Sequence, residues 1–246
     1  MLRHRLVTVL TFNDGTLFRT KLFEPDYRYT HNFVDSWLVD EIVMLDVTRT
    51  GGDNKAFLDV VGRFAHDCFV PLAVGGGIRT LADVRTFTAM GADKVVVNSG
   101  AVERPELISE IASAYGSQCV VLSIDARKTD GGYEVYAGCG GKATGLDPAE
   151  WAKEGENLGA GEVLITSVER DGSLQGYDLD LCRRVSDAVT VPVLVLGGAG
   201  TWKHFVEAIE QGGASAVCTQ NIYHFTESSI LSAKKFLADH GVAVRM

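Results

Sequence analysis

The sequence predicts one (β/α)₈ barrel, because eight short apolar segments alternate with segments of helical pattern and the two halves of the chain repeat each other. A length of 246 residues allows one large domain or two small ones, and such barrels commonly take about 250 residues. No Pro/Ser-rich linker or run of charge marks a domain boundary. We therefore predict one domain over residues 1–246, with half-barrels at about 1–120 and 121–246.

The eight apolar segments are rich in β-branched residues and have the length of strands. They are Leu6–Leu10, Ile42–Val47, Leu72–Val74, Lys94–Val97, Val120–Ile124, Glu162–Thr166, Val193–Leu196 and Ala216–Thr219. Helical pattern lies between most of them, as in Leu81–Met90 and Phe205–Gln211, which are followed by Gly-Ala and Gly-Gly. This alternation is typical of parallel βαβ units.

An internal repeat supports closure of the strands into a barrel. The segment Glu41–Arg49 aligns with Glu162–Arg170 at an offset of 121 residues, and the same offset relates Gly76-Gly77 to Gly197-Gly198. Two separated segments thus share one register. Eight strands in two equivalent halves close most naturally as a barrel, whereas an open doubly wound sheet does not need matching halves.

Composition excludes several classes of partner. The formal net charge of −9 and a pI near 5.1 disfavour nonspecific binding to nucleic acid or to an anionic membrane surface. No apolar run approaches the roughly 18 residues of a membrane span, and the first run ends at Thr11 without a signal-peptide cleavage site. Five cysteines, with no C-x-x-C pair, indicate reduced thiols. We expect a cytoplasmic protein without metal or cofactor.

Two glycine-rich segments follow predicted strands, and each has a polar pair one strand later. Glycines let the backbone approach an anion with its N–H groups, and a following helix adds a favourable dipole. For either set alone, a simple turn that closes a βα loop is the default alternative. Their duplication favours two phosphate sites and a ligand with a phosphate at each end. The predicted binding residues are Gly76, Gly77, Asn98 and Ser99 (the first cradle), and Gly197, Gly198 and Asn221 (the second cradle).

Polar residues also stand where predicted strands end, which is the catalytic end of a barrel. Asp125 is the sharpest candidate, because it directly follows the apolar segment Val120–Ile124 and a carboxylate there can act as a general acid or base. A helix cap or an ion pair with Arg127 is an equally good interpretation from the sequence. The other members of this group are Asp46, Thr48, Thr166, Ser167 and Asp171.

Four charged residues occur at the opposite ends of predicted strands. Residues at that end of a barrel usually contribute to stability rather than to catalysis. They are Arg5, Glu41, Lys94 and Glu162. Two cations and two anions at the bottom of a barrel form either a salt-bridged plug or a gate.

Several motifs, in order along nearly the whole chain, resemble the cyclase subunit of imidazole glycerol phosphate synthase. They are Gly75–Arg79, Gly91–Val95, Gly116–Gln118, Ile124–Ala126, Arg170–Gly172, Gly176–Asp178 and Gly197–Gly200. The resemblance implies a barrel that works with a separate glutaminase subunit. It also implies that ammonia enters at the bottom, crosses the core and reacts with a bis-phosphate ligand at the top. The four charges match the family's gate, which favours a gate over a plug.

The resemblance weakens at the catalytic end. Asp125 matches one of two family aspartates, but Thr11 stands where the first strand carries the other. Losing a general acid or base costs roughly 10²–10⁴-fold in rate, so we expect impaired cyclase activity. The aromatic-rich segment 21–29 also departs from the family, although Arg19 keeps a cation where the family has lysine. Leu196 and the run Thr219–Asn221 are bulkier than expected at the second cradle.

The four gate charges match the family, whereas the catalytic end of the barrel differs from it. This combination favours a paralogue that delivers ammonia to another acceptor. Barrels similar to this cyclase are associated with amidation of sugars for surface polysaccharide, where an acetamido group becomes an acetamidino group. Two alternatives remain open. One is a genuine cyclase of histidine biosynthesis, and the other is a noncatalytic scaffold that activates a glutaminase.

Overall fold

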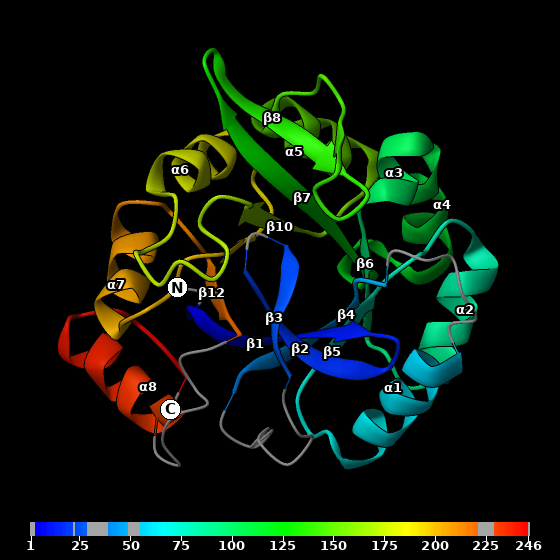
Figure 1. Ribbon diagram of the computed structural model, residues 1–246, viewed down its shortest axis with the longest axis horizontal. Helices are drawn as coiled ribbons and strands as arrows, with labels where there is room; N and C mark the ends of the chain where they lie inside the picture. The colour runs from blue at the N-terminus through cyan, green and yellow to red at the C-terminus, as the bar shows by residue number, and fades with distance from the viewer. Residues whose placement is uncertain (1–2, 22, 29–38, 49–54, 221–228, 246) are drawn as a thin grey trace.

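Eight parallel strands close into a barrel in the computed structural model, which describes residues 3–21, 23–28, 39–48, 55–220 and 229–245 (Figure 1). Each strand pairs with the next, and pairing of the last with the first closes the barrel. All eight predicted strands are confirmed. In order around the barrel they are β1 (Arg5–Asn13), β4 (Glu41–Asp46), β5 (Leu72–Gly75), β6 (Lys94–Val97), β7 (Val120–Thr129), β10 (Glu162–Ser167), β11 (Val193–Leu196) and β12 (Ala216–Thr219).

Helices surround the strands on the outside of the barrel (Figure 1). A capping box between Thr80 and Asp83 starts α2, and Asp147 caps the helix α5, which ends at Gly159 in the left-handed conformation. None of the described helices is long and apolar enough to cross a membrane. The described α-helices are α1 (Lys55–Asp67), α2 (Leu81–Ala89), α3 (Ser99–Glu103), α4 (Glu106–Tyr115), α5 (Pro148–Leu158), α6 (Leu179–Ala188), α7 (Trp202–Glu210) and α8 (Ser229–Asp239), with a 3₁₀ helix at Ser117–Cys119.

Two antiparallel hairpins, absent from our sequence prediction, extend the barrel strands beyond the catalytic end. The strands β2 (Thr16–Lys21) and β3 (Glu24–Arg28) fold back from β1, while β8 (Gly132–Ala137) and β9 (Lys142–Ala143) fold back from β7. The turn from β1 into β2 has positive φ at both Asp14 and Gly15. An Asp-Gly pair is a recognised signal for this hairpin turn.

Side chains inside the barrel form three successive layers, because alternate residues of each strand face inward. Along β1, Arg5 lies at the bottom, Val7 and Val9 lie in the middle, and Thr11 lies at the top. The middle layer is aliphatic and separates two polar ends. Its members are Val7, Val9, Val43, Ala73, Val96, Val121, Leu164, Leu194, Leu196, Ala216 and Cys218, with Leu45 packed against them.

Candidate active site

A pocket of about 380 Å³ opens where the strands end at the top of the barrel. Both predicted catalytic positions and the whole first cradle line it. Its polar lining residues among those described are Thr11, Thr20, Asp46, Thr48, Arg79, Asn98, Ser99, Ser123, Asp125, Thr166, Asp171 and Gln220.

Asp125 lies in this pocket with 8% of its surface exposed. Asn98, from the neighbouring strand end, donates a 2.8 Å hydrogen bond from its side-chain nitrogen to Oδ2 of Asp125. Burial raises the pKa of Asp125 to about 7, the bond from Asn98 opposes this, and the charge of Asp171 adds to it. A carboxyl group that titrates near neutral pH is suited to general acid–base chemistry.

Asp125 and Arg127 do not form the ion pair that the sequence allowed. The guanidinium of Arg127 lies over the ring of Tyr136 and donates to the carbonyl oxygen of Gly140. Its nearest carboxylate is that of Glu169, at 3.9 Å. Asp125 and Arg127 are two residues apart on a strand, but β7 continues as a hairpin at this point, which carries Arg127 beyond the pocket.

Thr11 is buried in the wall of the same pocket. Its hydroxyl donates a 2.6 Å hydrogen bond to the carbonyl oxygen of Phe18 on β2. The hairpin that our sequence prediction missed therefore supplies the acceptor for this hydroxyl. Because threonine does not ionise near neutral pH, Asp125 is left without a second carboxylate at this position.

The first cradle opens directly into the pocket. Gly76 and Gly77 have φ of +134° and +66°, and a Cβ added to Gly76 would lie 2.5 Å from the Cβ of Asp46. Only glycine fits there. Oδ1 of Asn98 is buried and has no hydrogen-bond partner within the described part of the chain, while the hydroxyl of Ser99 accepts a bond from the backbone of Gly138. Residues 138–141 of the β8–β9 turn were not predicted as part of the site.

The second cradle has the same backbone signature but much less space. Gly197 and Gly198 have φ of +95° and +105°, and they line a separate pocket of about 20 Å³. Oε1 of Gln220 accepts bonds from both the backbone nitrogen and the hydroxyl of Thr20, at 3.2 and 3.3 Å. Asn221 and the side chain of Arg19 lie outside what the structure describes.

The remaining predicted polar residues lie around the pocket and hold its loops. Oδ1 of Asp46 accepts bonds from the backbone nitrogen and hydroxyl of Thr48, and Thr166 is buried in the wall. Asp171 accepts one bond from the hydroxyl of Thr20 and one from the backbone nitrogen of Phe23. Thr20 was missed from sequence, since an isolated threonine carries no signal of its pairing partners.

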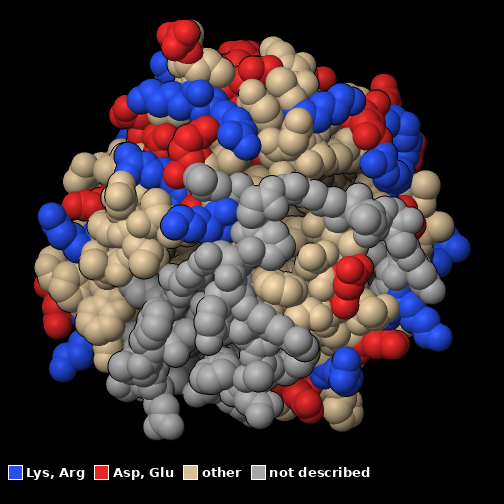
Figure 2. Space-filling view, viewed as in Figure 1, with Lys and Arg blue, Asp and Glu red and all other residues tan. Residues whose placement is uncertain are grey.

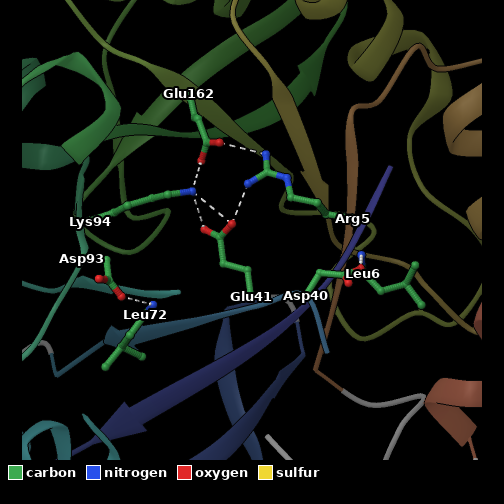
Figure 3. Close-up of polar contacts among 8 residues, drawn as sticks. All are labelled: Arg5, Leu6, Asp40, Glu41, Leu72, Asp93, Lys94 and Glu162. Atoms are coloured by element: carbon green, nitrogen blue, oxygen red, sulfur yellow. Dashed lines mark hydrogen bonds and ion pairs between the residues drawn. The ribbon is translucent and has the colours of Figure 1, made fainter. Parts of the chain in front are cut away.

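At the other end of the barrel, Arg5, Glu41, Lys94 and Glu162 point toward one another and form a closed ring (Figure 3). Each carboxylate contacts both cations, with N–O distances from 2.5 to 2.9 Å. We call these four residues the charged ring. Burial lowers the pKa of Arg5, but the charges of Glu162 and Glu41 outweigh it and raise that pKa above its ordinary value.

Two aspartates hold the strand ends that carry the charged ring (Figure 3). Asp40 directly precedes Glu41 and accepts a 2.8 Å bond from the backbone nitrogen of Leu6. Asp93 directly precedes Lys94 and accepts a 2.8 Å bond from the backbone nitrogen of Leu72. These bonds link neighbouring strands next to the ring, and so they restrain its backbone.

Positive and negative side chains are interspersed over the upper rim in Figure 2, near α5, α6 and the β7–β8 hairpin. A nucleic-acid site would instead gather Lys and Arg on one surface. On the visible part of this face, the described residues form no such basic patch.

The fold and the site define a (β/α)₈ barrel of the enzyme type, in which a polar pocket stands at the C-terminal strand ends. Residues 9–229 match the family described as histidine biosynthesis protein, and the chain belongs to that family. The family consists of barrel isomerases and cyclases of histidine biosynthesis, which supports an enzyme.

Proposed function

We propose that the chain is the cyclase-like subunit of a glutamine-dependent complex and passes ammonia from a glutaminase partner to an acceptor in the upper pocket. The observation that carries the proposal is the charged ring. It joins four strands at the end of the barrel opposite the pocket, where a barrel enzyme has no general need of buried charge.

The interior above the ring supports passage of a small neutral molecule. Small side chains such as Ala73, Ala216 and Cys218 alternate with valines and leucines between the ring and the pocket floor. An aliphatic layer excludes ammonium, because an isolated charge is costly to bury, whereas neutral ammonia avoids that cost. The ring and this layer together would let ammonia through and keep ions out.

The face around the ring also offers apolar contact area for a partner. Phe69 is 67% exposed and lies in the connection that enters β5, while Met90 is 41% exposed and lies between α2 and β6. Both connections reach the strands at the end that carries the ring. Exposed aromatic and Met side chains are enriched in protein interfaces.

For the acceptor, we propose a sugar of a surface polysaccharide. The support is Thr11, which replaces a carboxylate of the cyclases that the sequence resembles, together with the narrow second cradle. Retention of Asp125 in the pocket favours chemistry at this site over a noncatalytic scaffold.

The decisive assay uses the bis-phosphate substrate of the histidine-pathway cyclase and excess ammonium, which bypasses the glutaminase. We expect little turnover by the wild type and increased turnover by Thr11→Asp. Efficient turnover by the wild type, with growth of a cyclase-deficient strain that expresses it, would establish the histidine-pathway alternative instead. If Asp125→Asn leaves product formation in the complete complex unchanged, the barrel is a scaffold or a conduit.

Partner binding is tested separately by titrating a purified glutaminase subunit and following its glutaminase activity. We expect Phe69→Asp to weaken association by about tenfold or more, because it places a charge in an apolar contact. The matched control is Leu231→Asp, at a 47% exposed leucine of α8. Equal affinity of both variants and the wild type would contradict docking at the ring end.

A further inference from the structure

The two cradles share a backbone design but offer a ligand very different space. Each has paired glycines with positive φ at a strand end. The first opens into the pocket of about 380 Å³, whereas the second lines a pocket of about 20 Å³, which is room for about one water molecule. A phosphate group fits the first and not the second.

The second cradle is closed in part by side chains at positions where this sequence is bulkier than the family it resembles. Gln220 stands at the end of β12 and lines both pockets, and its carbonyl oxygen is held by the backbone and hydroxyl of Thr20. The single proton of the Thr20 hydroxyl is shared between Gln220 and Asp171, so three segments at the strand ends are connected there. Leu174 and Leu196 also line this pocket.

The two pockets also differ in the cations among their described lining residues. Arg79, the described cation of the larger lining, stands two residues after Gly77 of the first cradle, and its guanidinium is also paired with Glu103. The smaller pocket has no Lys or Arg among its described lining residues, while Asp171 lines both pockets and the larger one also includes Asp46 and Asp125. A dianion at the second cradle would therefore find no cation among the described lining residues, whereas one at the first cradle has Arg79 in the lining.

The rest of the larger pocket is rich in hydroxyl groups. Thr11, Thr20, Thr48 and Thr166 line it, and a hydroxyl can both donate and accept hydrogen bonds. Such a lining suits the uncharged hydroxyl groups of a sugar.

We infer that the acceptor carries a single phosphate group, bound at the first cradle, and that its other end is neutral and hydroxyl-bearing. This inference rests on the proposed function, since it names the class of acceptor. A bis-phosphate would leave its second charged group facing Gln220 and Asp171.

The first measurement is the number of inorganic phosphate ions bound per chain, by titration calorimetry on the wild type. We expect one, with binding lost in Ser99→Asp, which places a carboxylate in the first cradle. Gln220→Ala should bind two, and Gln211→Ala, a substitution at the exposed end of α7, should still bind one. Two or no phosphates on the wild type would overturn the inference. One on Gln220→Ala would overturn the role of Gln220.

A second measurement compares fructose 6-phosphate with fructose 1,6-bisphosphate. Similar affinities are expected for the wild type, with a preference for the bisphosphate in Gln220→Ala. A wild-type preference of about tenfold to 100-fold, the gain from an additional charge-assisted hydrogen bond, would show an open second site. Neither measurement involves ammonia or a glutaminase. A failure here therefore leaves ammonia transfer standing, and a failure of partner binding leaves the phosphate count standing.

Discussion

Asn98 holds the buried carboxylate of Asp125 through a hydrogen bond of 2.8 Å, although the sequence had suggested Asn98 only as a phosphate ligand. The other polar atom of the same amide, Oδ1, is buried and lacks a partner within the described residues. If Asp125 takes up a proton, its hydroxyl can donate to that oxygen. The side chain thus links the first cradle with the candidate acid–base group.

This link predicts how stability changes with pH. Because burial raises the pKa of folded Asp125 to about 7 from an ordinary value of 3.8, the folded state keeps a proton that the unfolded chain releases first. The stabilising contribution is complete below pH 4 and is lost as pH rises toward 7, by up to about 4 kcal/mol at 1.4 kcal/mol per unit. Urea unfolding of wild type and Asp125→Asn at pH 5 and 8 measures it. The wild type should lose stability relative to the variant at pH 8, whereas parallel profiles would contradict the assigned pKa.

Thr11→Asp should cost stability even if it restores acid–base chemistry. An ionised aspartate cannot donate to the carbonyl oxygen of Phe18, 2.6 Å from the threonine hydroxyl, and it would place two acceptors together in a buried site. We expect a loss of about 1–3 kcal/mol in the free energy of unfolding, larger at pH 8 than at pH 5. Thr11→Ser keeps the donor and serves as the control. An aspartate variant as stable as the serine variant at pH 8 would argue against this hydrogen bond.

The charged ring should show strong coupling between its members. Lys94→Met leaves Glu41 and Glu162 with only Arg5, so we expect a loss of about 3–5 kcal/mol. Adding Glu162→Gln to Lys94→Met restores neutrality, and the double variant should lose less than the sum of the single losses. Chemical unfolding of the three variants gives the coupling energy.

An exposed ion pair on α7 is the reference for this double-mutant comparison. Lys203 lies on α7, with its Nζ 3.3 Å from Oε1 of Glu207, and its side chain is 76% exposed. Lys203→Met should change stability by less than about 1 kcal/mol. Additive effects within the charged ring would mean that its charges are solvated independently, and the gate would lose its physical basis.

Gly76→Ala tests the backbone of the first cradle. At a φ of +134°, an added Cβ meets Asp46 at 2.5 Å, so the strand end must shift. We expect destabilisation of about 2 kcal/mol or more, with weaker phosphate binding. Gly131→Ala, where an added Cβ meets nothing within 4 Å, should be nearly neutral. Thermal unfolding compares the two, and equal melting temperatures would contradict the tight approach.

The barrel was predictable because each of its strands is buried on both faces and reads as a continuous apolar segment. The segments Lys94–Val97, Val193–Leu196 and Ala216–Thr219 agree with the structure at both ends. The hairpins were missed because strands such as Thr16–Lys21 mix polar and aromatic residues without a clear alternation. The turn pair Asp14-Gly15 was the available signal.

The sequence by itself determined the strand order of the barrel, the charges at its bottom and the polar residues at its top, since each depends on position within one βα unit. Only the tertiary structure decided what these residues meet. Closure of the barrel brings Arg5 to Glu162, pairing of β6 with β7 brings Asn98 to Asp125, and folding of a hairpin brings Thr20 to Gln220. Those contacts join residues far apart along the chain, so local pattern carries no information about them. The bond from Asn98 lowers the pKa that burial raises at Asp125, and the contact of Thr20 with Gln220 narrows the second cradle.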